Sequence, residues 1–241
     1  MTLCKLTNEY NKTYNDTQWG EGVTHVTSGE CELCGSGWIH YYDSPLVAVL
    51  LNPIHAGFIN PNLWSIMVNG EIKKGHDSKF GTTSLTTIER IPLPEINPTQ
   101  KIIFGILCAF EVYHDEEFKA WGERWIDGTD RSVEAAEAVV TRVAVTAERN
   151  VAWNVAWAAW NAAVAATRAA RDAFAVEWAE RVVRQRRQRQ RDAVTVEWAE
   201  RAVVIAERNV AWNVACAAAE AAKTNVEIDF NALAQKAITC G

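Results

Sequence analysis

The decapeptide AERNVAWNVA stands unchanged at residues 147–156 and again at 206–215. A longer unit, RDAFAVEWAERVV at 171–183, returns at 191–203 as RDAVTVEWAERAV. Both pairs lie in a stretch of 110 residues, 131–240, that contains neither glycine nor proline. Because these two residues interrupt helices, a segment that lacks them and is rich in alanine, arginine and glutamate is predicted to be helical. Repeats this close predict one helical module duplicated to stack against its own copies.

The order of the repeats indicates how the helical half folds back. The two decapeptides centre near residue 181 and the two longer units near residue 187, and RQRRQRQR at 184–191 contains no apolar residue. We therefore expect a long helical hairpin or bundle with its turn near 184–191. One continuous rod in a coiled coil is the alternative. The hairpin is favoured over the rod because the apolar positions do not keep a strict heptad.

The chain ahead of the repeats predicts a small mixed α/β head over 1–95 and linker helices over 96–130. Short β-rich runs bounded by turn residues predict strands at Leu3–Thr7, Val23–Thr27, Trp38–Tyr42, Leu63–Val68 and Leu85–Ile91. Ser44 followed by Pro45 predicts a helix start, and Asn97 and Asp115 are expected to begin the linker helices, the second of which ends at Gly128. With 131–241 as the helical repeat domain, the predicted fold class is α+β.

Charge is unevenly distributed along the chain. Residues 1–130 carry 9 Lys and Arg against 17 Asp and Glu, whereas residues 131–241 carry 15 against 13. Because phosphate-driven binding needs a clear basic excess, the chain does not have the composition of a dedicated DNA-binding protein. The arginine cluster at 181–191 is the local exception, and it keeps RNA or DNA binding open as an alternative.

Cysteine usage and hydropathy indicate a protein of the reducing cytoplasm. The first residues, MTLCKLTNEYNK, lack the apolar core of a signal peptide, so the six cysteines are not expected to form disulfides. His25, Cys31, Cys34 and His40 have an H-x5-C-x2-C-x5-H spacing that is unusual for zinc, and we expect neither a metal nor a cofactor. The uncharged run over 150–167 contains three asparagines, so no membrane span is expected.

One face of the repeated decapeptide combines tryptophan, arginine and asparagine. Indoles stack on bases, arginine pairs with phosphate and asparagine amides recognise base or ribose edges, so the combination suits a nucleotide. The predicted ligand-binding residues are Arg149, Asn150, Trp153, Asn154, Trp157, Arg208, Trp212 and Asn213. The alternative is that the tryptophans fill the core of a helix bundle, where the asparagines bond to each other.

Several segments of the first 130 residues resemble known sequences. They include GSGWIHYYDSPLVAVLLNPIHA at 35–56, followed by LWSIMVNGE, LTTIERIPLPE and FGILCAFEVYHDEEFKAWGERWIDGTDRS. With the alanine-rich run beyond, these segments are similar to a group of uncharacterised bacteriophage and prophage accessory proteins, which pair a small "GW-H-Y-P" head with an alanine-rich helical tail. The resemblance implies a phage accessory protein in the host bacterial cytoplasm, without a particular activity.

Small phage accessory proteins often sequester nucleotide immune signals. We therefore expect a non-enzymatic sponge for a small nucleotide-like anion, assembled as a homo-oligomer because alanine and tryptophan faces leave apolar surface uncovered. A structural assembly protein of helical repeats is the main alternative. A third possibility is an NAD-related enzyme that would use a set such as His40, Tyr42 and Glu89.

Overall fold

The computed structural model describes residues 2–75, 78–149, 157–172 and 193–240, with side chains described outside 145–149 and 193–200. The chain forms two compact units, each described below by itself. The first comprises Met1–Ile96 and Glu227–Lys236, and the second comprises Asn97–Val226 and Ala237–Gly241. The first unit contains an antiparallel sheet and the second a helix bundle, so the expected α+β class is confirmed.

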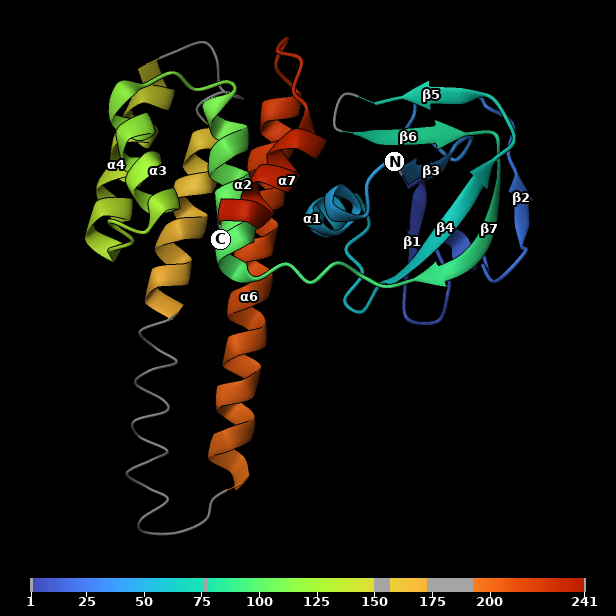
Figure 1. The fold of residues 1–241 in the computed structure, drawn as a ribbon, viewed down its shortest axis with the longest axis horizontal. Coiled ribbons are helices and arrows are strands. Elements are labelled where there is room, and N and C mark those ends of the chain that lie inside the picture. The colour runs from blue at the N-terminus through green and yellow to red at the C-terminus, as the bar shows by residue number, and fades with distance from the viewer. Residues whose placement is uncertain (1, 76–77, 150–156, 173–192, 241) are drawn as a thin grey trace. The chain divides into compact units, whose positions relative to one another are not determined.

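The first unit is built on a seven-stranded sheet (Figure 1). Its strands are β1 (Cys4–Thr7), β2 (Thr24–Val26), β3 (Ile39–Tyr42), β4 (Asn62–Val68), β5 (Ile72–Lys74), β6 (Lys79–Thr82) and β7 (Ser84–Ile91). They lie in the order β2-β7-β4-β1-β3-β6-β5, and all the neighbouring pairs are antiparallel. A short link over 69–71 joins β4 to β5, but β4 pairs with β7 and β5 with β6, so the link does not close a hairpin.

Side chains from both faces of the sheet are buried. Helix α1 (Pro45–His55) packs on β1 and β3, and its start follows from its sequence, since Ser44 Oγ accepts from Val47 N at 3.4 Å and Pro45 fits the first turn. A cluster on the sheet contains Trp19, Ile39, Tyr41 and Leu85. A 3₁₀ turn at Tyr14–Asp16 precedes Trp19. The first unit is thus a sheet with a short helix, as the sequence predicted.

Five helices make up the second unit: α2 (Pro98–Phe110), α3 (Glu116–Asp127), α4 (Val133–Arg149), a helix over 157–172, and α6 (Ala193–Ala222). The predicted boundaries of α2 and α3 are confirmed. Asn97 and Gln100 form a capping box at the start of α2, and the Asp115 carboxylate accepts from Phe118 N at 2.8 Å. Gly128 ends α3 with a φ of 82°, a left-handed conformation that glycine adopts without strain.

Helix α2 lies at the centre of the bundle, with all residues from Ile102 to Ala109 buried. It packs against α6, where a Cβ on Gly105 would stand 3.4 Å from Val214. The helix over 157–172 and α6 run antiparallel and side by side (Figure 1), and both line one cavity. This agrees with a fold-back of the repeats, although the predicted turn at 184–191 lies outside the described residues.

The glycine-free half contains a helix break that the sequence analysis did not predict. Helix α6 ends at Ala222, and α7 (Phe230–Cys240) begins after Asp229, whose carboxylate accepts from Ala232 N at 3.0 Å. Here Ala221 O accepts from both the amide and the hydroxyl of Thr224, at 3.1 and 2.7 Å, and the helix ends at this turn. Among the helices that the structure describes, none has both the length and the apolar character that a bilayer crossing requires.

Candidate functional site

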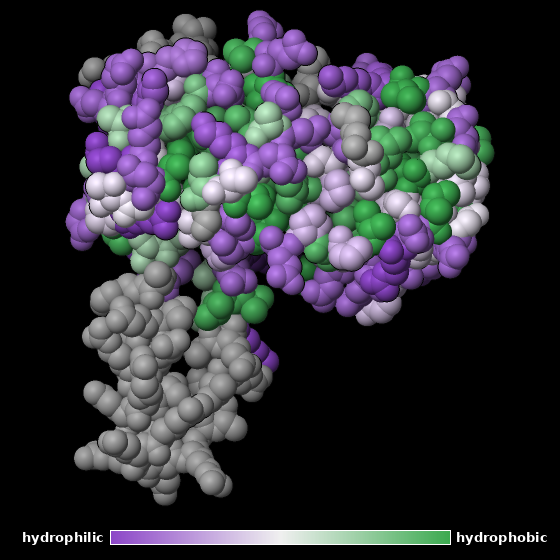
Figure 2. All heavy atoms as spheres, in the orientation of Figure 1, coloured by the Kyte–Doolittle hydropathy of each residue, from purple (hydrophilic) through white to green (hydrophobic). Residues whose placement is uncertain are grey.

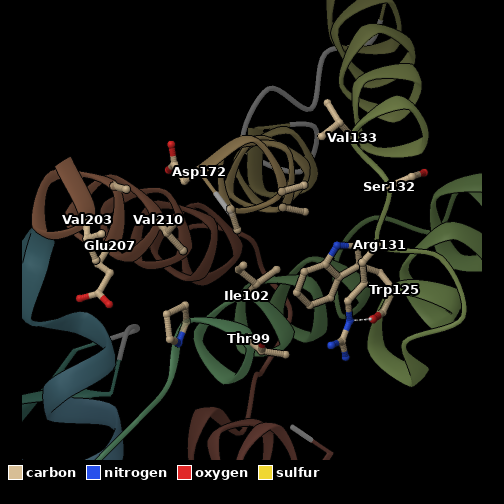
Figure 3. A pocket seen from close by; sticks show the side chains of 15 residues that line it. Thr99, Ile102, Trp125, Arg131, Ser132, Val133, Asp172, Val203, Glu207 and Val210 are labelled. Atoms are coloured by element: carbon tan, nitrogen blue, oxygen red, sulfur yellow. Dashed lines mark hydrogen bonds between the residues drawn. The ribbon is translucent and has the colours of Figure 1, made fainter. Parts of the chain in front are cut away.

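A cavity of about 580 Å³ lies in the helical unit (Figure 3). Its walls come from α2, the end of α3, the start of α4 with the segment that joins them, the helix over 157–172, and α6. The lining residues are Pro98, Thr99, Ile102, Trp125, Arg131, Ser132, Val133, Ala166, Ala169, Ala170, Asp172, Val203, Ala206, Glu207 and Val210. Most of these side chains are apolar, and the volume falls in the range that holds small molecules and cofactors.

Trp125 forms one wall of the cavity and is held there by Arg131. The left-handed Gly128 ends α3 and returns the chain, so that Arg131 Nε donates to Trp125 O at 2.8 Å and Nη2 donates to Ile126 O at 3.2 Å. The guanidinium carbon lies 4.9 Å from the centre of the indole ring. In Figure 3 the ring extends toward Ile102 across the hollow. These contacts preorganise the indole before any ligand arrives.

The Trp125 indole N–H is buried without a hydrogen-bond partner in the part of the chain that the structure describes. Trp125 is only 3% exposed. Leaving such a donor unpaired costs about 1–3 kcal/mol. A ligand that placed a carbonyl, ring nitrogen or hydroxyl oxygen against this N–H would recover that energy.

Charged groups stand at the margin of the cavity (Figure 3). Burial raises the pKa of the Asp172 carboxyl above its usual range, and Arg168 opposes the shift. Burial lowers the pKa of the Lys101 amine, and the nearby Glu207 opposes that shift. Two carboxylates, Asp172 and Glu207, therefore line the cavity with one cation, Arg131, whose guanidinium is already bonded to Trp125 O and Ile126 O. This balance suits hydroxyl or amine donors on the ligand and disfavours a ligand with several phosphates.

The structure describes half of the predicted ligand-binding residues. Asn150, Trp153 and Asn154 lie outside the described residues, and the side chain of Arg149 is not described. Trp157 begins the helix over 157–172, is 36% exposed, and meets Trp160 edge-on with ring centres 4.7 Å apart. None of the four predicted ligand-binding residues whose side chains the structure describes lines the cavity.

The second copy of the decapeptide divides between core and surface. Arg208 is exposed and Trp212 is 52% exposed on α6, whereas Asn213 is buried. The Asn213 amide donates to Asn209 O at 2.9 Å, one turn earlier in the same helix. The asparagine therefore satisfies its own helix at this position, and Trp212 with Arg208 remains as surface.

Trp125 and the lining residues of α2 were missed because they come from the segment interpreted as linker helices, whereas the other lining residues belong to the helical repeat domain. Trp125 recurs at helical spacing with Phe118 and Trp121, which indicated a buried helix face and nothing more. Arg131 follows the helix-ending Gly128 by three residues, which is close enough for its side chain to fold back onto Trp125. This spacing of Trp125, Gly128 and Arg131 is the sequence signal that could have indicated the cavity wall.

The candidate groups of the head are not assembled into a site. His25 bonds to Gln18 O and His40 to Leu33 O through their ring Nε2 atoms. Among the described residues, no three His, Cys, Asp or Glu side chains gather closely enough to hold a metal ion. Glu89 is on β7 and His40 is on β3, with β4 and β1 between them, so about 14 Å of sheet separates their strands.

Comparison of the chain with protein-family models, curated proteins and solved structures found no match. The resemblance to phage accessory proteins therefore stays a prediction. We therefore base the proposed function on the geometry of the cavity and on the surface of α6.

Proposed function

We propose that the protein binds and sequesters a small nucleoside-like ligand, or one with a single phosphate, without converting it. The observation that supports this is the unpaired Trp125 N–H in the wall of a 580 Å³ cavity. A nucleobase has the flat apolar faces that the aliphatic floor accepts and the edge acceptors that the indole N–H lacks. Its ribose hydroxyls would donate to the carboxylates at the margin, as ribose does in dinucleotide-binding folds.

Sequestration is favoured over turnover by the chemistry of the lining. The described residues that form the cavity include neither histidine nor cysteine, the side chains most often used for proton transfer and for attack at neutral pH. In a phage accessory protein, a binder of this kind would remove a nucleotide immune signal from the host. The exposed Trp212 and Arg208 form a second candidate surface for the same ligand class, as the repeat predicted.

Trp125→Phe is expected to weaken ligand binding about 5- to 30-fold, since it removes the N–H and keeps most of the ring. The measurement is calorimetric titration with nucleosides, nucleoside monophosphates and cyclic nucleotides, supported by the ligand-dependent rise in melting temperature. Trp121→Phe is the matched control. Its indole N–H is also buried without a partner among the described residues, but Trp121 does not line this cavity.

The ligand is then recovered by heating the complex. Recovery of intact ligand would support sequestration. Recovery of a chemically altered ligand would show that the protein converts the ligand and is an enzyme. Ala169→Leu, which fills the cavity from the helix over 157–172, is expected to abolish binding. Equal affinity in wild type, Trp125→Phe and Ala169→Leu would exclude the cavity. No binding across the whole panel would exclude the ligand class and leave the assembly protein as the better description.

We also propose, from the sequence and from α6, that the protein forms a homo-oligomer. Val204, Ile205 and Trp212 are 61%, 60% and 52% exposed on this helix, and Figure 2 shows hydrophobic surface there. A second copy of this chain is the simplest partner to cover this apolar surface. Two α6 helices related by a two-fold axis would pack the same surface of each copy against the other. Light scattering should give a multiple of 26.8 kDa, and Val204→Lys with Ile205→Lys should reduce it to the monomer. A monomeric wild type at micromolar concentration would contradict the proposal.

A further inference from the structure

The loop between β2 and β3 holds two exposed cysteines that the proposed function does not use. Cys31 and Cys34 are both free and exposed. The loop is fixed at Cys31, whose carbonyl accepts from Trp38 Nε1 at 3.1 Å and from Lys73 Nζ at 3.3 Å. It is therefore an anchored surface loop that presents two thiols, separated by two residues, to solvent.

A tight turn of this loop contains Cys34 and has Cys31 beside it. Gly35 N donates to Glu32 O at 2.7 Å, which closes a turn around Leu33 and Cys34. A Cβ placed on Gly35 would stand 3.1 Å from Cys31 Cβ, so the Cys31 side chain lies against the residue that follows Cys34. Cys31 therefore lies against the turn that carries Cys34, and the two cysteines have the Cys-X-X-Cys spacing that thiol–disulfide exchange motifs use.

A lysine distinguishes the two thiols. Lys79 is only 8% exposed on β6, and its Nζ donates to Cys34 Sγ at 3.3 Å. An ammonium at the sulfur stabilises the negative charge that this atom carries when it attacks another sulfur. The lysine near Cys31, Lys73, bonds to the carbonyl of that residue. The environment therefore favours Cys34 as the attacking residue and Cys31 as the second, resolving residue.

We propose that Cys31 and Cys34 form a reversible dithiol–disulfide centre that exchanges with low-molecular-weight disulfides, independently of the ligand-binding site. Cys34 loses its proton and attacks one sulfur of the external disulfide, forming a mixed disulfide and expelling one thiolate. Cys31 then loses its proton and attacks Cys34 Sγ, forming the Cys31–Cys34 bond and expelling the second thiolate. The two released protons go to the departing thiolates. The protein dithiol is thereby oxidised, and the external disulfide is reduced to two thiols.

The test uses the full chain and oxidised glutathione, with intact-mass and peptide mass spectrometry. The wild type is expected to lose two hydrogens at the Cys31–Cys34 peptide and to retain no glutathione there. Cys31→Ser should trap a glutathione adduct on Cys34, whereas Cys34→Ser should react at Cys31 several-fold more slowly. Cys240 is exposed and serves as an internal control, since it should form the adduct without an internal disulfide.

Lys79→Met is expected to slow the reaction of Cys34 about fivefold, the factor that one charge contact provides when water screens it, since Cys34 is exposed. Lys73→Met, which removes a bond to the Cys31 carbonyl, should change that rate less than twofold. If Lys79→Met disturbs the fold, the two cysteine variants still decide the question. Equal rates in Cys31→Ser and Cys34→Ser, or a stable glutathione adduct on wild-type Cys34, would overturn the proposal. Zinc bound stoichiometrically and released on thiol blocking would also overturn it.

Discussion

Lys5→Met is expected to stabilise the head unit at pH 7. Most of this stabilisation should be lost when the pH is raised to 10. Lys5 is only 5% exposed in the middle of β1. Its Nζ donates to His40 O at 2.9 Å and lies 4.6 Å from the centre of the Trp19 ring. The sheet therefore surrounds this amine with one carbonyl and one aromatic face, and burial lowers its pKa from 10.5 to about 7.

The sign of the pH dependence follows from proton binding in the two states. Between about pH 7 and 10.5 the unfolded chain holds a proton on Lys5 that the folded chain has released, so stability rises with pH across this window. Below pH 7 both states are protonated and the whole cost of the buried charge remains. The difference between the pKa of Lys5 in the unfolded and in the folded chain corresponds to a loss of folding stability on the order of 4 kcal/mol at pH 7.

Methionine keeps the apolar stem of Lys5 and removes the charge, while losing the bond to His40 O at a cost of about 1 kcal/mol. We therefore expect a net gain of about 2–3 kcal/mol at pH 7 and almost none at pH 10. The measurement is urea unfolding of the head at several pH values, compared with Lys12→Met, which removes a lysine from an exposed ion pair with Asp16. Parallel curves for the wild type and Lys5→Met would show that the buried ammonium carries no such cost.

The features that the sequence predicted well are those set by a few neighbouring residues. Ser44, Asn97 and Asp115 each begin a helix as expected, because each side chain accepts from a backbone amide three residues later. Gly128 ends α3 as expected, because glycine adopts a left-handed φ without strain. The end of α6 was missed for a related reason. The turn at Thr224, whose amide and hydroxyl both bond to Ala221 O, lacks the glycine or proline that usually mark such a site.

The order of the strands could not be predicted from local pattern. Adjacent strands β4 and β5 do not pair, and β1 instead lies between β4 and β3. Which strands pair, and in which register, depends on which apolar faces cover each other after folding. Lys5 illustrates the difficulty, because a lysine in a β-rich run indicates the solvent side of a strand, and here it is buried against Trp19.

The candidate cavity depends on distant parts of the chain in the same way. Ile102, Trp125 and Val210 come from three elements and meet only through the packing of the bundle. The sequence analysis placed the ligand site on the tryptophans of the repeated decapeptide, because a duplicated segment can be recognised in a sequence. A cavity cannot be recognised there. Within the second copy, Asn213 is buried and bonded to its own helix, while Trp212 is exposed.

Trp121→Ala is expected to destabilise the helical unit by about 3–5 kcal/mol, whereas Trp212→Ala should change its stability by less than about 0.5 kcal/mol. Trp121 is 1% exposed on α3, with its ring centre 5.5 Å from that of Phe118, so truncation leaves a cavity in the core. Trp212 is 52% exposed on α6, and most of its ring has no packing to lose.

Because both changes are tryptophan to alanine inside a helix, the gain in helix propensity is the same and cancels in the comparison. Denaturant unfolding followed by circular dichroism at 222 nm, roughly the helix minimum, measures both variants. A large loss in Trp212→Ala would mean that this indole packs as core. The second ligand surface and the self-association of α6 would then have no support, because both require the Trp212 side chain to face solvent in the free protein.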